Sequence, residues 1–267
     1  SDKPRDLKQK GLNIICLQEF FQRSKMPQRI LVTGSEGLIG KIIVPALKEE
    51  GNDLILLDKK AQKPVDLLHD EIESYFSGIE TVVHLAGNTF WIDRQKAGEN
   101  VIMTYRVLEA SRILDVKRLV YASSINVHDY SRLYLKGGKI DKNTPIIPHA
   151  KSDWEERKES VFHYSMSKIM SEDLTRYYHD KFGISAINLR FGAVHPRNVP
   201  YTNEPDDYAI WLSHEDLIEI IKHAVKFNGF ENVVCVSDNS EHFVDLSHLE
   251  KVLGYGPKSN SEVFRNN

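Results

Sequence analysis

Short apolar runs alternate with segments of helical periodicity along most of the chain, and this rhythm constrains the fold more than any other feature. The apolar runs are Ile30–Thr33, Asp53–Asp58, Thr81–Leu85, Arg118–Ala122 and Ser185–Arg190. Helical spacing covers Leu38–Glu50, Glu99–Leu114, Tyr164–Phe182 and Glu215–Phe227. Nearly continuous apolar strands between helices are typical of a parallel sheet that is covered on both faces. Right-handed crossovers then predict an α/β fold with a doubly wound parallel sheet.

The composition excludes several functional classes. The 267 residues carry 35 Lys+Arg against 38 Asp+Glu, so the basic excess typical of nucleic-acid binders is missing and we expect no nucleic-acid partner. No apolar run approaches the ~18 residues of a membrane span, so we expect no membrane partner either. Cys16 and Cys235 form no Cys-x-x-Cys pair. This cysteine usage argues against a metal site and indicates a cytoplasmic protein.

A glycine-rich segment, Thr33–Gly40, lies directly between the first predicted strand and the first predicted helix. Glycines at this place permit a tight turn, a close approach of backbone N–H groups to a pyrophosphate, and close helix–strand packing. A magnesium-dependent phosphate loop is disfavoured, because Ile42 stands where that loop needs Ser or Thr. We therefore predict a Rossmann-type dinucleotide site that includes Gly34, Gly37, Leu38, Ile39 and Gly40.

Asp58 ends the second predicted strand, about where an acid binds the adenosine ribose of a dinucleotide. A carboxylate there would repel a 2′-phosphate, so Asp58 favours NAD over NADP. Lys59 and Lys60 follow at once and weaken this preference. The alternative is an acid that ends a strand in a polar turn and has no ligand.

A serine, a tyrosine and a lysine suit hydride-transfer chemistry. Ser124 ends the fourth predicted strand, at the sheet edge where open α/β sheets place their chemistry. Tyr164 and Lys168 are four residues apart on a predicted helix and share a face. We expect the Lys168 cation to lower the pKa of the Tyr164 phenol, so that the phenol accepts a proton from an alcohol. The alternative is a surface tyrosine that packs on a lysine stem.

These motifs occur in one order from Ile30 to the C-terminus, and together they resemble the extended short-chain dehydrogenases/reductases of the epimerase/dehydratase branch. The matching motifs are Thr33–Gly40, Asp58, Asp66-Leu67, His84–Gly87, Asn100, Ser123-Ser124, Tyr164/Lys168 and Leu189-Arg190. The resemblance implies that Asp66 and Leu67 lie by the adenine, that Leu85, Ala86 and Gly87 line the cofactor site, and that Asn100 supports it. It also implies NAD as the cofactor and Ser124, rather than Ser123, as the catalytic serine.

Within that branch the C-terminal part looks most like the uronate dehydrogenases and the short NAD-dependent glucose-6-phosphate dehydrogenases. The similar segments are Trp211–Asp216, Leu246–Asn260, Tyr177–Asp180 and Val236–Asn239. The chain departs from the uronate pattern after Ser124, where Asn126 comes one place late, and at Ala193, which replaces a substrate serine.

The expected substrate contacts are Thr89, Asn126, Arg197 and Asp206. Asp206 falls where uronate dehydrogenases carry their carboxylate-binding arginine, and Arg197 is the nearby replacement. An inward Arg197 would suit an acidic or phosphorylated sugar, since a guanidinium binds such anions with two hydrogen bonds. An Arg197 in solvent would favour a neutral aldose.

Three parts are expected along the chain. Residues 1–25 form an N-terminal extension, and Leu12, Ile15, Leu17, Phe20 and Phe21 are spaced as one face of a helix. This extension either docks on the main domain, has no function, or is a partner-binding arm, and a homo-oligomer is left open. Residues 26–190 form the NAD-binding domain. Residues 191–267 form a small substrate-binding lobe together with the last strand and helices of the same fold.

The leading hypothesis is an NAD-dependent dehydrogenase that oxidises an aldose or uronic acid to a lactone. One alternative is an NAD-dependent sugar epimerase or dehydratase with a tightly held cofactor, but a dehydratase needs an acid where this chain has Ile125. The other is a non-catalytic NAD-binding regulatory protein, which does not need the set of Ser124, Tyr164 and Lys168.

Overall fold

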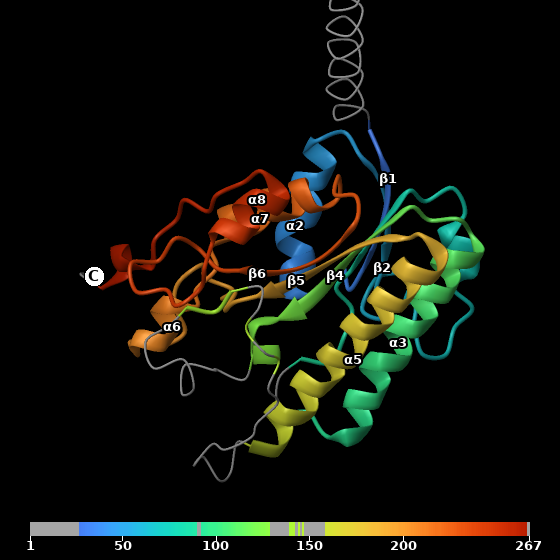
Figure 1. The fold of residues 1–267 in the computed structure, drawn as a ribbon. Coiled ribbons are helices and arrows are strands. Elements are labelled where there is room, and N and C mark those ends of the chain that lie inside the picture. Colours follow the sequence, from blue (N-terminus) through green and yellow to red (C-terminus); the bar gives the residue numbers. More distant parts are fainter. Residues whose placement is uncertain are drawn as a thin grey trace, which may run out of the picture.

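The computed structural model describes residues 27–89, 92–128, 139–141, 144, 146 and 158–265, and of residues 158–161 only the backbone. Within these ranges six parallel strands form one sheet in the order β2-β1-β3-β4-β5-β6 (Figure 1). The strands are β1 Arg29–Thr33, β2 Asp53–Leu57, β3 Thr81–His84, β4 Arg118–Ser124, β5 Ser185–Phe191 and β6 Phe230–Cys235. The predicted doubly wound α/β fold is confirmed.

Helices cover both faces of the sheet (Figure 1). One face is covered by α3 (Arg94–Ile113) and α5 (Lys158–Phe182), whose apolar side chains form one core with the strands. The other face carries α2 (Leu38–Glu49), α7 (His214–Ala224) and α8 (Ser247–Leu253), which form the second core. The shorter elements are α6 (Pro205–Ala209) and the 3₁₀ helices η1 Glu73–Phe76, η2 Ile125–His128 and η3 Ser261–Phe264.

Element boundaries differ from the sequence prediction where local hydrogen bonds decide them. Helix α3 begins at Arg94, ahead of the predicted Glu99, because the Asp93 side chain caps it by accepting a hydrogen bond from the Lys96 backbone N at 2.9 Å. The last strand, expected but not located from the sequence, is β6, which pairs in parallel with β5. The predicted helix of residues 1–25 lies outside the described residues.

The strand order reverses at β1, and this places the functional edge of the sheet. Thr33, the last residue of β1, pairs with Leu57 of β2 on one side and with His84 of β3 on the other. Open α/β sheets bind ligands at such a switch point, beyond the carboxyl ends of the strands. The glycine-rich segment follows β1 and Leu85 follows β3, so both meet at this edge.

Among the described residues, none of the helices is long and apolar enough to cross a lipid bilayer.

The C-terminal segment is fastened to the domain by a buried carboxylate. Asp216 accepts hydrogen bonds from the Ser237 hydroxyl at 2.6 Å and the Tyr255 hydroxyl at 2.7 Å. The backbone N–H groups of Lys258 and Ser259 donate to it at 2.9 and 3.1 Å. These hydrogen bonds together hold the pKa of Asp216 below its ordinary value although burial acts to raise it.

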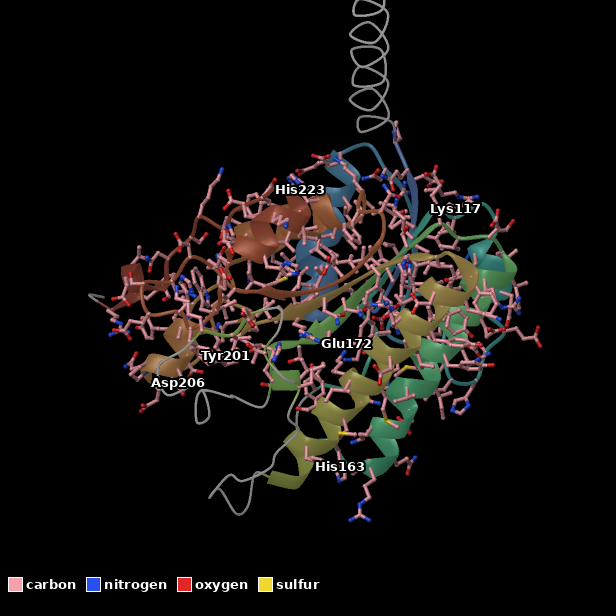
Figure 2. The ribbon with its side chains drawn as sticks, viewed as in Figure 1. Lys117, His163, Glu172, Tyr201, Asp206 and His223 are labelled. Atoms are coloured by element: carbon pink, nitrogen blue, oxygen red, sulfur yellow. The ribbon has the colours of Figure 1, made fainter. Side chains whose placement is uncertain are left out.

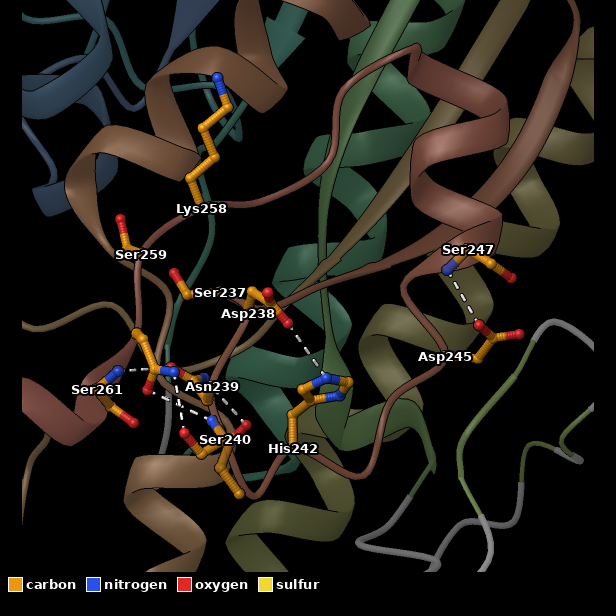
Figure 3. Close-up of polar contacts among 12 residues, drawn as sticks. Ser237, Asp238, Asn239, Ser240, His242, Asp245, Ser247, Lys258, Ser259 and Ser261 are labelled. Atoms are coloured by element: carbon orange, nitrogen blue, oxygen red, sulfur yellow. Dashed lines mark hydrogen bonds and ion pairs between the residues drawn. The ribbon is translucent and has the colours of Figure 1, made fainter.

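A second contact lies close by. The Asn239 side-chain oxygen accepts the Ser261 backbone N–H at 3.0 Å, and the Asn260 amide donates to the Ser240 hydroxyl at 3.0 Å (Figure 3). Together with Asp216, these side chains tie the last residues of the described chain to the ends of β6 and α7.

We predict that Asp216→Asn lowers the free energy of unfolding by about 2–4 kcal/mol, because an amide cannot accept from all four donors. Its lowered pKa means that the Asp216 contribution is present near neutral pH and is lost as the pH falls and the folded protein takes up this proton. Denaturant unfolding at neutral and acidic pH measures the difference, which should shrink in acid. Asp173→Asn, a change at an exposed site on α5, is the control. Equal stability of Asp216→Asn and the parent at neutral pH would contradict this role.

Candidate active site

The turn after β1 has room for glycine only. Gly34 has a φ of +72° and donates its N–H to the Leu57 carbonyl at 2.8 Å. A Cβ at Gly34 would lie 2.7 Å from the Ala86 backbone N, and one at Gly40 would lie 2.5 Å from the Gly34 oxygen. The loop is therefore packed directly against the residues that follow β3.

The amino end of α2 offers backbone donors to an anion. Gly37 is the N-cap residue, and it has no side chain that could accept from the first N–H groups of the helix. These N–H groups belong to Leu38, Ile39 and Gly40, and a helix cannot satisfy them internally. A phosphate suits this position, because the helix dipole and the N–H groups both favour negative charge.

Asp58 lies beside this loop. Its carboxylate accepts the Glu36 backbone N–H at 3.0 Å and the Lys60 backbone N–H at 2.8 Å. The Asp58 backbone oxygen accepts a hydrogen bond from the Val65 backbone N at 3.1 Å. This contact brings the following residue, Asp66, back towards Asp58. Each carboxylate oxygen keeps a further lone pair, so the ribose hydroxyls of a dinucleotide can still donate to it.

The predicted adenine residues are held in place by their own contacts. Asp66 accepts the Leu68 N–H at 2.9 Å, and Leu67 is buried. The Leu67 carbonyl accepts from the Arg106 guanidinium at 2.6 Å, which ties this segment to α3.

Asn100 connects the sheet edge that is predicted to bind the cofactor to α5. The Asn88 backbone N donates to the Asn100 side-chain oxygen at 2.6 Å, and the Asn100 amide donates to the Ser167 hydroxyl at 3.1 Å. A Cβ at Gly87 would lie 3.4 Å from the Asn100 oxygen and 3.9 Å from the Lys168 ammonium. The backbone at Leu85 and Ala86 donates to Thr33, at 3.1 Å to its carbonyl and at 3.2 Å to its hydroxyl. These contacts fit a dinucleotide, because they fix a row of small residues, Ala86 and Gly87, at the edge of the sheet beside the glycine-rich turn.

Tyr164 and Ser124 are in contact. Tyr164 is buried on α5, and its side chain is hydrogen-bonded to that of Ser124 at the end of β4. Burial raises the pKa of Tyr164 to about 12, while the hydrogen bond with Ser124 acts to lower it. We expected the Lys168 cation to lower this pKa. In the structure the pKa of Tyr164 is raised instead, because burial disfavours the charged phenolate.

Lys168 lies beneath the two tyrosine rings of the site. Its ammonium donates to the Ala122 carbonyl at 2.6 Å and lies 4.9 Å from the Tyr121 ring centre and 5.7 Å from that of Tyr164. Burial lowers the pKa of Lys168 to about 8, and the Glu172 carboxylate opposes this shift. Lys168 is thus a buried ammonium that keeps its proton at neutral pH.

A buried ion pair behind Lys168 was not predicted from the sequence. Glu172 accepts from the Arg190 guanidinium at 3.0 and 2.7 Å and from the Ser123 hydroxyl at 2.6 Å. Figure 2 labels Glu172 on the side of α5 that meets the sheet. The sequence signal that could have indicated Glu172 is the spacing of Tyr164, Lys168 and Glu172, which are four residues apart on one helix. Its partner Arg190 lies on β5 and meets Glu172 only in the folded protein.

The predicted substrate residues are less well gathered. Asn126 is buried, and its backbone N donates to the Ser124 hydroxyl at 3.2 Å. Thr89 is exposed, and so is Arg197, whose backbone N donates to the His195 ring at 3.1 Å. Asp206 is half-buried in α6 (Figure 2). Of the four, only Asn126 has a described contact with a predicted catalytic residue, so the substrate roles stay predictions.

Comparison with known proteins assigns the family. The model of the NAD dependent epimerase/dehydratase family matches residues 30–209, and the chain belongs to this family. Its cofactor is NAD, and the predicted resemblance is confirmed.

Particular relatives are similar over nearly the whole chain. Uronate dehydrogenase of Pseudomonas putida is 28% identical, over 89% of this chain and 86% of its own length. L-arabinose 1-dehydrogenase (NAD(P)(+)) of Haloferax volcanii is 27% identical, over 87% and 97%. The crystal structure of a uronate dehydrogenase mutant from Agrobacterium tumefaciens complexed with NAD superposes with a TM-score of 0.73 at 26% identity, covering 90% of this chain and 88% of that one.

We predict that the protein binds NAD more tightly than NADP, because the Asp58 carboxylate repels a 2′-phosphate. Asp58→Ser should weaken NAD binding and narrow the preference, measured by fluorescence titration with each dinucleotide. Asp53→Ser, at the opposite end of β2, is the matched control and should leave both affinities unchanged. Tighter binding of NADP than of NAD by the parent would contradict the assignment.

Proposed function

We propose that the protein is an NAD-dependent oxidoreductase that oxidises a sugar or sugar acid, with Tyr164 as the proton acceptor. The observation that carries this proposal is the buried contact between Ser124 and Tyr164, with the Lys168 ammonium 5.7 Å from the Tyr164 ring. This set lies at the same sheet edge as the glycine-rich segment. The names of the relatives, uronate dehydrogenase and L-arabinose 1-dehydrogenase, support a sugar-type substrate.

Each residue has a distinct task in this proposal. Bound NAD supplies the acceptor for a hydride from the sugar carbon. Ser124 orients the reacting hydroxyl by a hydrogen bond, Tyr164 takes the hydroxyl proton, and Lys168 stabilises the phenolate through its charge. A buried position strengthens that attraction, since water does not screen it.

Two alternatives from the sequence predict different products. An epimerase or dehydratase returns the hydride and yields no net NADH, and a regulatory protein yields none either. The position after Ser124 holds Ile125, which is buried and apolar and cannot act as the acid of a dehydratase.

The test is a panel of free sugars, sugar acids and sugar phosphates incubated with NAD and followed by NADH absorbance. We expect stoichiometric NADH with at least one free sugar or sugar acid. A panel without NADH, together with interconversion of nucleotide-linked sugars, would replace this proposal by the epimerase.

We predict that kcat/KM rises about tenfold per pH unit up to about pH 8 and then levels off. Below that pH the ionised fraction of Tyr164 grows while Lys168 keeps its proton; above it the loss of the Lys168 proton offsets the gain. Tyr164→Phe should bind NAD normally and lose activity by ~10²–10⁴. Lys168→Met should have low activity that continues to rise above pH 8.

The matched control is Tyr177→Phe, which removes a hydroxyl from an exposed tyrosine on the same helix. It should leave activity and the pH profile unchanged. Normal turnover by Tyr164→Phe would show that another group accepts the proton.

Within this function we propose a neutral aldose as the substrate. Arg197 is exposed, Arg190 is neutralised by Glu172, and Asp206 would repel a carboxylate. Of the expected substrate residues, the one that contacts Ser124 is the uncharged Asn126, through its backbone N–H.

We predict that a neutral aldose gives a higher kcat/KM than glucuronate or galacturonate, and that Arg197→Ala changes neither value appreciably. Steady-state kinetics with both sugar classes measures this. Efficient glucuronate oxidation that collapses in Arg197→Ala would assign the carboxylate to Arg197 and contradict the neutral substrate.

Two further expectations stay predictions, a cytoplasmic location and the lack of a nucleic-acid partner, and association between copies of the chain stays open.

A further inference from the structure

Glu172 is a buried carboxylate that the proposed chemistry does not use directly. Its side chain is 4% exposed, and it lies one helical turn beyond Lys168 on α5. Arg190 and Ser123 fix both of its oxygens with three hydrogen bonds of 2.6–3.0 Å. A buried ion pair is weak evidence for stability alone, because the desolvation of two charges offsets their attraction. The position of this charge beside Lys168 therefore indicates a role in the function of Lys168.

The other groups that face Lys168 carry no charge at neutral pH. On β3, burial and the Lys168 charge lower the pKa of His84 to about 3, so its ring is neutral. On β4, burial raises the pKa of Tyr121 well above its ordinary value. On α3, the nearby polar groups are Asn100 and Thr104, which do not titrate.

The ion pair itself is shielded on its far side by a neutral group. The Arg190 guanidinium can only donate, so the His128 ring nitrogen 3.0 Å away accepts and that ring is neutral. Around Lys168 the formal charges are then those of Lys168, Glu172 and Arg190, which sum to one positive charge. An ionised Tyr164 would bring this buried set to zero.

We propose that Glu172 is a positioning residue for catalysis, whose fixed carboxylate keeps Lys168 protonated beside Tyr164. Glu172 is a helical neighbour of Lys168, since residues four apart share one face of α5, whereas Arg190 belongs to β5 and reaches this site through its contact with Glu172. The direction of the Lys168 pKa shift that Glu172 causes, upward against burial, agrees with this geometry. The inference rests on the proposed function of Tyr164 and Lys168.

The first test needs no substrate. The Lys168 side-chain nitrogen is titrated by NMR in ¹⁵N-lysine-labelled protein, with Lys168→Met to assign its signal. In Glu172→Gln, Lys168 should lose its proton at a pH lower by about 1 unit, as expected for the removal of a neighbouring opposite charge. Asp173→Asn, which removes an exposed carboxylate one residue away, should leave the titration unchanged.

The second test uses activity. In Glu172→Gln the pH at which kcat/KM levels off should fall by the same amount, and the plateau value of kcat/KM should be correspondingly lower. Glu172→Asp, which keeps the charge, should restore most of the parent profile. A purely structural role would lower activity at every pH and leave the levelling point where it is.

A variant that leaves Arg190 buried without its partner can fail to fold. The double variant Glu172→Gln/Arg190→Gln removes both charges and keeps hydrogen-bonding groups, and it too should lower the pH at which Lys168 titrates. Titration of Lys168 at the parent pH in the folded variants would overturn the inference. The proposed function fails separately, if no sugar in the panel yields NADH.

Discussion

The backbone contact between the turn after β1 and the turn after β3 is the constraint on which the rest of the structure depends. A side chain at Gly34 would collide with Ala86, so these two turns can approach only if the first is glycine. Their approach lies where the strand order reverses, and it sets the amino end of α2 and the carboxylate of Asp58 along one edge. The predicted cofactor site follows from this packing rather than from any single polar residue.

The proposed catalytic residues depend on how charged groups are stabilised in the protein interior, away from water. Tyr164 and Lys168 are both shifted by burial toward their uncharged forms, one upward and one downward in pKa. An isolated pair would therefore tend to lose its charge, and the carboxylate of Glu172 counters this tendency for Lys168. The fold brings this charge to α5 and holds it with Arg190 from β5.

The sequence predicts the parts whose geometry is local. Strand and helix periodicity predicted five of the strands, and the positions of Gly34, Asp58, Ser124 and Tyr164 followed from the ends of those strands and one helix. The Glu172–Arg190 pair could not be predicted, because its members meet only when α5 packs on β5. The prediction of a lowered phenol pKa was wrong for a related reason. Residue spacing shows that Lys168 is near Tyr164, but it does not show how deeply the phenol is buried, and burial raises its pKa. The substrate residues depend on loops without periodicity.

The most direct test of the central claim follows the hydride itself. Aldoses and uronates that carry deuterium at C1 are incubated with the protein and NAD, and the nucleotide and sugar are analysed by mass spectrometry. A dehydrogenase with Tyr164 as base transfers one deuterium to each released NADH and yields an equal amount of oxidised sugar. Deuterium that stays in the sugar, with no net NADH and an inverted or dehydrated product, would contradict the account.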